Sequence, residues 1–110
     1  MALVVQKFGG TSVGSVERIQ AVAEKLKKSY DGGDQIVVAV SAMSGETNRL
    51  LQLAREISQD PVTRELDVLL STGEQVTIAL LAMALETLGV PSRSYTGGQV
   101  RILTDSAPGW

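Results

Sequence analysis

Two short valine-rich runs, each closed by a turn of small residues, place the strongest constraint on the fold of this chain. The first run is "ALVVQ", which is followed by Lys7 and a glycine pair, and the second is "IVVAVSA", which is followed by "MSGET". Apolar runs of this length bounded by turn residues predict buried strands. The segment between them predicts a helix, so the two strands are expected to lie parallel in one sheet.

Helical periodicity follows each of the two turns. After the first turn, apolar residues recur at spacings of three and four, with Ser15 as the expected N-cap: Val16, Ile19, Val22, Ala23 and Leu26. "YDGGDQ" is expected to end this helix. After the second turn, Leu50, Leu51, Leu53, Ala54 and Ile57 predict a second helix, capped by Thr47 or Asn48.

The region from Asp60 to Pro91 predicts a third helical stretch in two parts. Pro61 is expected in its first turn, where the missing N–H does no harm. "LLSTGEQ" is expected to interrupt the stretch, and "VTIALLAMALETL", apolar on nearly every side, is expected to be buried against several neighbours. Gly89 and Pro91 are expected to end it.

The order of these elements predicts an α/β fold, a three-layer αβα sandwich with a mostly parallel sheet and right-handed crossovers. Short strands are also expected in "SRSYT" and around residues 100–103. In such folds, ligands bind beyond the carboxyl ends of the strands. The turns at residues 7–11 and 41–47 are therefore the places to look for a site.

Composition excludes several classes of chemistry. The chain has no cysteine and no histidine, which removes disulfides, thiolate chemistry, the commonest general base and the commonest metal ligand. The net charge of −2 does not favour a nucleic-acid or anionic-membrane surface. We see no secretion signal and no apolar run that approaches a membrane span. We therefore expect a soluble cytoplasmic protein with no metal ligands of its own.

The first candidate site is the turn after the first strand. Gly9 and Gly10 let backbone amides approach an anion, and Lys7 adds a full positive charge. Thr11 supplies a hydroxyl, and a helix N-terminus just behind the glycines would add partial positive charge. The pattern is neither a P-loop nor a dinucleotide fingerprint. A phosphate cradle and a purely structural glycine turn both remain open from the pattern alone.

Two further clusters carry polar groups. Ser41, Ser44, Thr47 and Asn48 follow the second strand closely and could hold a small polar ligand or cap the next helix. Glu74 lies between two apolar segments, where a carboxylate is costly unless paired. Its partner could be a ligand ammonium or a backbone N–H at the head of a following helix.

Taken in order, these stretches resemble the aspartate kinases of the amino acid kinase family. "VVQKFGGTSVGSVERI" is similar to their N-terminal signature almost word for word. "VVAVSAMSGETNRLL", "LLSTGEQVTIALLAMAL" and "SYTGGQVRILTD" continue the likeness, which covers residues 2 to about 106. The first motif is specific, because other kinases of the fold keep the lysine and glycine but differ in the residues that follow.

The resemblance implies ATP-dependent phosphorylation of the side-chain carboxylate of L-aspartate, the first step toward lysine, threonine and methionine. It implies that Lys7, Phe8, Gly9, Gly10 and Thr11 contact ATP, with Lys7 as the catalytic residue that neutralises charge on the phosphoryl group. It further implies that Ser41, Thr47 and Glu74 bind aspartate, with Glu74 receiving the ammonium, and that Mg²⁺ accompanies ATP. Phosphoryl transfer depends on positioning and charge neutralisation, so it needs neither histidine nor cysteine.

The family's kinase domain is more than twice this long, and regulatory ACT domains usually follow it. We therefore expect residues 1–110 to be the N-terminal portion of a kinase domain, without ACT domains and inactive alone. The catalytic aspartate, a second lysine, most of the nucleotide pocket and an arginine for the substrate carboxylate would lie outside it. Two alternatives remain, which are a binding or assembly module, including a homo-oligomer, and a kinase of another amino acid or a nucleotide.

Overall fold

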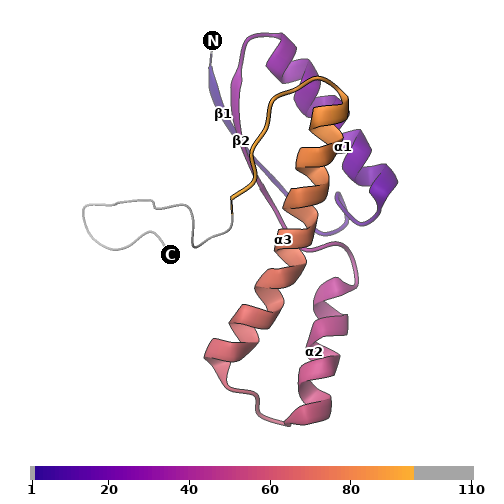
Figure 1. Ribbon diagram of the computed structural model, residues 1–110, viewed down its shortest axis with the longest axis vertical. Coiled ribbons are helices and arrows are strands. Elements are labelled where there is room, and N and C mark those ends of the chain that lie inside the picture. Colours follow the sequence, from indigo (N-terminus) through magenta and orange to yellow (C-terminus); the bar gives the residue numbers. More distant parts are fainter. Residues whose placement is uncertain (1, 96–110) are drawn as a thin grey trace, which may run out of the picture.

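The computed structural model describes residues 2–95, which form a small parallel sheet and three helices (Figure 1). In chain order the elements are β1 (Leu3–Phe8), α1 (Val16–Asp31), β2 (Gln35–Val40), α2 (Glu46–Ile57) and α3 (Thr63–Thr87). β1 and β2 pair in parallel, with Leu3 opposite Gln35 and Phe8 opposite Val40. The predicted α/β class with a parallel sheet is confirmed.

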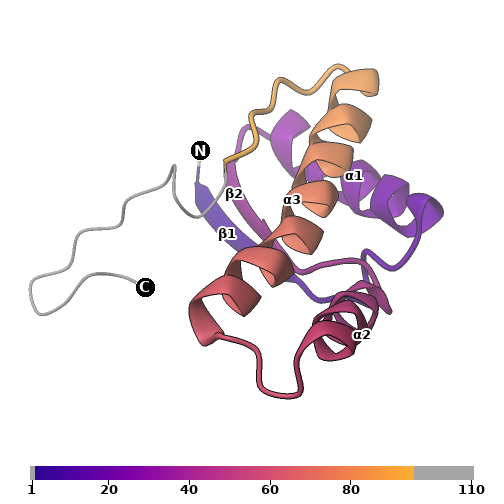
Figure 2. The ribbon, with the colours of Figure 1, turned by 60° about the horizontal axis from the view of Figure 1, so that its bottom comes forward.

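Helices cover one face of this sheet. α1 and α3 contact each other and β2, and Figure 2 shows both helices on the same side of the strands. On the opposite face Leu3, Val5 and Val37 are 67%, 71% and 54% exposed. The strands were expected to be buried, but one face of the sheet is exposed and the other is mostly half-buried. Residues 2–95 contain two of the three expected layers.

The core lies between α1, α3 and the helix-covered face of β2. Its buried members are Val13, Ile19, Val22, Ala23, Leu26, Val40, Leu81, Leu85 and Val90. Four of them are among the five residues that the helical periodicity of α1 marked as apolar, and the fifth, Val16, is 57% exposed. Val13 lies in the turn between β1 and α1 and is fully buried, so this turn is anchored to the core.

α1 begins and ends as the sequence predicts. Ser15 is its N-cap, and the Ser15 hydroxyl accepts a hydrogen bond from the amide of Arg18 at 3.2 Å. The helix ends at Asp31, and the following Gly33 has a φ of 97°, a left-handed conformation that favours glycine. Both ends of the helix are therefore determined by local residues.

The expected caps of α2 are wrong. Neither Thr47 nor Asn48 precedes the helix, because α2 begins at Glu46 and both residues lie in its first turn. The N-cap is Gly45, whose φ of 82° reverses the chain directly after "AMS". With Gly45 in the left-handed conformation, the helix begins at Glu46, before the two residues that were expected to cap it.

α3 is one continuous helix, so the expected interruption at "LLSTGEQ" is also wrong. It begins at Thr63, which leaves Pro61 outside the first turn. The hydroxyls of Ser71 and Thr72 donate to the carbonyls of Val68 and Leu69, one turn earlier in the same helix, and so do not compete with the helical hydrogen bonds.

α3 is less buried than its composition predicts. Its buried positions recur every fourth residue on one face, at Gly73, Thr77, Leu81 and Leu85. Val68, Val76 and Met83 are 56%, 48% and 60% exposed on its other sides. By length and composition alone, this helix could cross a membrane, whereas no apolar run of that kind was expected from the sequence. A core helix of a soluble protein meets the same test.

The chain leaves α3 through Gly89, whose φ is 78°, and Pro91, as predicted. Residues 92–95 form no strand, so the strand expected in "SRSYT" is absent from the part of that segment the structure describes. The strand expected around residues 100–103 lies outside the described residues.

Candidate functional site

The turns that follow β1 and β2 lie side by side at the carboxyl ends of the two strands. The amide of Ser41 donates to the carbonyl of Phe8 at 3.1 Å, which extends the pairing of the strands by one residue. A Cβ at Gly10 would lie 3.1 Å from the carbonyl oxygen of Ala42. This contact is tighter than side chains usually make, so glycine at position 10 allows the two turns to pack.

Hydrogen bonds hold the first turn in shape. The amide of Ser12 donates to the Gly9 carbonyl at 3.0 Å, and the Arg18 guanidinium donates to the Thr11 carbonyl at 3.0 Å. Within residues 2–95, the amides of Gly10 and Thr11 donate to no protein acceptor. Two backbone N–H groups in a rigid, glycine-containing turn can bind an anion.

The helix dipole contributes less here than the sequence suggests. α1 begins at Val16, so the five residues 11–15 separate its first helical residue from the glycine pair. The Ser15 hydroxyl already accepts the amide of Arg18 in the first helical turn. Because the dipole acts mainly within the first turn, the turn amides and Lys7 carry the positive potential instead.

Lys7 and Phe8 lie on opposite faces of the sheet, although the resemblance groups them as ATP contacts. Lys7 is exposed on the open face, beside Ala39 of β2. Phe8 is partly buried on the helix-covered face and packs against the core. Only one of these two side chains can therefore face a ligand on the open side of the sheet, and that is Lys7.

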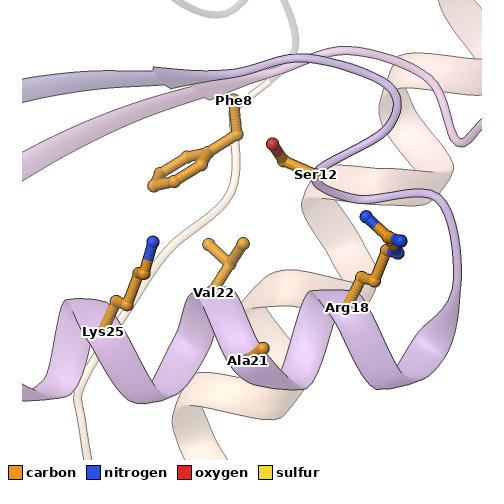
Figure 3. Close-up of a pocket in the computed structure, with 6 residues that line it drawn as sticks. All are labelled: Phe8, Ser12, Arg18, Ala21, Val22 and Lys25. Carbon is orange, nitrogen blue, oxygen red and sulfur yellow. The ribbon is translucent and has the colours of Figure 1, made fainter.

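A pocket of about 190 Å³ lies on the other side of the same turn, between the Phe8 ring and α1 (Figure 3). Its lining residues are Phe8, Ser12, Arg18, Ala21, Val22 and Lys25. Lys25 points from α1 toward the Phe8 ring, and Arg18 points toward the turn. Arg18 was not predicted from the sequence, although its position in the first turn of a helix after a glycine turn is a signal that could have marked it.

The second turn presents the polar side chains that the sequence singled out. Ser41 is half-buried directly after β2, while Ser44, Thr47 and Asn48 are exposed. Because Gly45 is the N-cap of α2, no side chain caps this helix. The capping interpretation therefore fails for Thr47 and Asn48, and both side chains are free of that role.

An ion pair orders the first turn of α2. The Glu46 carboxylate accepts a hydrogen bond from Nε of Arg49 at 3.1 Å and a second from its Nη2. The hydrogen bonds from Arg49 lower the pKa of the Glu46 carboxyl below its ordinary value, and the same carboxylate raises the pKa of Arg49. This pair lies directly beside Thr47.

Glu74 lies in the middle of α3, and its side chain is exposed. The expectation of a buried carboxylate is wrong, because the helix turns this side chain away from the core. The alternative partner, a backbone N–H at the head of a following helix, is also excluded, since no helix begins near Glu74. An exposed carboxylate is solvated and needs no protein partner, so the ammonium contact of Glu74 stays a prediction.

α3 meets the second turn at Gly73, the residue before Glu74. A Cβ at this position would lie 2.9 Å from Cβ of Ala42 and 3.5 Å from Cγ of Glu46. Ala42 therefore packs against Gly73 on α3 while its carbonyl packs against Gly10 in the first turn. The three motifs, distant in sequence, meet around this one buried alanine.

Residues 2–95 contain no group of three or more acidic side chains able to hold a metal ion. The groups that the sequence singled out for binding are amides, hydroxyls, Lys7 and Glu74. Such groups suit an anionic phosphate at the first turn and a small zwitterion at the second. Fold and candidate site together define an α/β protein whose predicted ligand site lies at the carboxyl ends of parallel strands.

Comparisons with known proteins narrow this class. The sequence pattern of the amino acid kinase family matches residues 2–107, and this chain belongs to that family. An aspartate kinase of Stutzerimonas stutzeri is 78% identical over 97% of this chain, and aspartokinase 2 of Bacillus subtilis is 54% identical over 99%.

The chain spans about a quarter of the length of these relatives, 26% and 27% respectively. A solved aspartate kinase from Synechocystis is similar in structure, with a TM-score of 0.87 and 58% identity. The likeness covers 90% of this chain and 17% of the solved one. The predicted family is confirmed, and the residue roles remain predictions.

Proposed function

We propose that this chain is the N-terminal part of an aspartate kinase, which transfers the γ-phosphoryl group of ATP to the side-chain carboxylate of L-aspartate. A carboxylate oxygen forms the new bond to phosphorus while the bond to the ADP oxygen breaks, so the products are aspartyl phosphate and ADP. The observation that carries the proposal is the meeting of the three motifs around Ala42. The identities of 54–78% to named aspartate kinases support the choice of substrate.

On this proposal the first turn binds the nucleotide. The amides of Gly10 and Thr11 donate to phosphate oxygens, and Gly9 allows the phosphates to approach the backbone. Phe8 holds the end of β1 against the core, while Lys7 lies at the exposed strand end, where its ammonium neutralises charge on the phosphoryl group. Mg²⁺ would enter with ATP and be bound mainly by its phosphates.

The second turn and α3 bind the amino acid. The hydroxyls of Ser41 and Thr47 hydrogen-bond the aspartate carboxylates, and Glu74 pairs with the ammonium. A charged partner orients the substrate and excludes analogues that lack the amine. The exposed positions of Thr47 and Glu74 are compatible with these roles, because a ligand must be able to reach both groups.

The exposed sheet face supports a second proposal, that residues 1–110 alone do not turn over. Leu3, Val5 and Val37 form an apolar surface beside Lys7. Phosphoryl transfer needs a site from which water is excluded, and an uncovered sheet face leaves Lys7 in solvent. We also propose a cytoplasmic location and, for this uncovered face, burial against further protein, including a second copy.

The test is a chimera in which residues 2–107 replace the matching segment of the Stutzerimonas stutzeri relative. We expect ADP release that depends on L-aspartate, with an acyl phosphate trapped by hydroxylamine. Glutamate should not substitute. A chimera that folds but phosphorylates glutamate, or neither amino acid, would contradict the proposed substrate.

Variants of the chimera test the roles. Lys7→Ala should lower kcat about a hundredfold or more, as loss of one charge-stabilising donor does, while Lys28→Ala, another exposed lysine, should not. Glu74→Ala should raise the KM for aspartate about ten- to a hundredfold, the worth of a hydrogen-bonded charge, with Glu86→Ala on the same helix as its control. Equal effects of Glu74→Ala and Glu86→Ala would exclude a specific ammonium contact.

A titration of the 110-residue chain with aspartate asks whether this part alone binds the amino acid. Binding that Glu74→Ala abolishes would support a preformed site. If the folded chain does not bind aspartate, the site requires residues beyond this segment.

A further inference from the structure

We propose that Gly73 is a positioning residue for the amino-acid substrate. Its missing side chain lets α3 lie directly on the turn after β2, and this contact sets where Glu74 stands relative to Ser41 and Thr47. The inference rests on the proposed function, because it assigns Glu74 and the two hydroxyls to one substrate.

The contact at Gly73 is closer than any side chain allows. A Cβ there would lie 2.9 Å from Cβ of Ala42, whereas two carbons in good contact are about 3.5–4.0 Å apart. Ala42 is 6% exposed, and its Cβ has no torsion through which it could move aside. A residue larger than glycine at position 73 must therefore displace backbone by about 0.6 Å or more.

The backbone conformation at this position does not require glycine. Gly73 lies inside α3 and is not among the described glycines with positive φ, which are Gly33, Gly45 and Gly89. Glycine inside a helix is unfavourable relative to alanine. Among residues 2–95, the close approach of α3 to the turn is therefore the structural reason for glycine at this position.

A backbone displacement at position 73 would affect the residues that neighbour Ser41, Thr47 and Glu74, the three residues assigned to aspartate. Ala42 follows Ser41, and Glu46, whose Cγ lies 3.5 Å from the Cβ position of Gly73, precedes Thr47. Glu74 follows Gly73 on α3. We therefore expect a wider spacing at this contact to change the position of Glu74 relative to both hydroxyls.

The first turn should be affected less. Gly10 of this turn contacts the Ala42 carbonyl. The shape of the turn, however, depends on its own hydrogen bonds, from the amide of Ser12 to Gly9 and from Arg18 to Thr11, and on the buried side chain of Val13. The expected signature is therefore a change in the KM for aspartate without a matching change in the KM for ATP.

The experiment uses the chimera described above with Gly73→Ala. We expect the KM for aspartate to rise about tenfold or more, since misplacement of a binding group by about 1 Å can cost about a hundredfold. The KM for ATP should stay within about twofold. Gly32→Ala is the matched control, because Gly32 follows α1, has a φ of −76°, and a Cβ there would meet only ordinary contacts of 3.4 Å and longer.

The double variant Ala42→Gly/Gly73→Ala separates positioning from simple damage. It moves the methyl group from one side of the contact to the other, so the KM for aspartate should return to that of Ala42→Gly alone. A Gly73→Ala enzyme with an unchanged KM for aspartate would overturn the inference. Equal rises in the KM for aspartate and the KM for ATP would also overturn it, as would a double variant whose KM for aspartate stays raised. An unmodified chimera without aspartate kinase activity would overturn the proposed function itself.

Discussion

Replacing Val13 with alanine tests whether the turn after β1 is held in place by the core. Val13 is fully buried in the turn that carries Gly9, Gly10 and Thr11. It belongs to the same core cluster as Ile19 and Leu81, so it links the turn to both α1 and α3. No other side chain of the segment between β1 and α1 is buried.

The expected loss of stability follows from the groups removed. Val13→Ala deletes the equivalent of two methylene groups, which is worth about 1.6 kcal/mol of transfer free energy at about 0.8 kcal/mol each. The cavity left behind adds to this, and we expect about 2–3 kcal/mol in total. For a chain of this size such a loss lowers Tm by about 10 °C.

The assay is urea and thermal denaturation of the chain followed by circular dichroism, with Val5→Ala as the matched control. The control deletes the same atoms from a side chain that is 71% exposed on the open face of the sheet, so its cost should stay below about 1 kcal/mol. Equal losses for the two variants would refute the idea that Val13 anchors the turn. A large loss for Val5→Ala would also show that the open face is covered in solution.

Two further predictions concern helix ends. Ser15→Ala should lower the free energy of unfolding by about 1 kcal/mol, because it removes the cap on the amide of Arg18, while Ser15→Asp should retain it; equal losses in urea denaturation would contradict this. The folded-state pKa of Glu46 is lowered by Arg49, so this pair stabilises the chain above the ordinary glutamate pKa, and the contribution disappears as the pH falls through the folded-state value. Glu46→Gln should therefore be less stable than the parent at pH 7 and equally stable in strong acid, and a stability difference that persists in acid would argue against the assignment.

The local pattern was sufficient for much of the fold. Valine-rich runs predicted β1 and β2, and the spacing of Ile19 and Leu26 predicted α1 and its buried face. Ser15 was identified as the cap because its hydroxyl needs only an amide three residues along the same chain. These features depend on neighbours in sequence, so the sequence alone determines them.

The same kind of pattern failed where contacts between distant residues decide the outcome. "LLSTGEQ" contains turn residues, yet α3 continues through it, and its glycine fits against Ala42, which lies in the turn after β2. Glu74 is exposed for the same reason, since a continuous helix directs it away from the buried face. No property of residues 71–76 alone indicates where Ala42 will lie.

The candidate site divides in the same way. Sequence by itself determined which groups are present: a lysine at a strand end, a glycine turn, hydroxyls after β2 and one glutamate. The tertiary structure decided which of them share a place, because parallel pairing brings the two turns to one edge and Gly73 lets α3 approach them. It also decided that Lys7 faces the open side of the sheet while Phe8 faces the core, since side chains alternate along a strand and only one face is covered by helices.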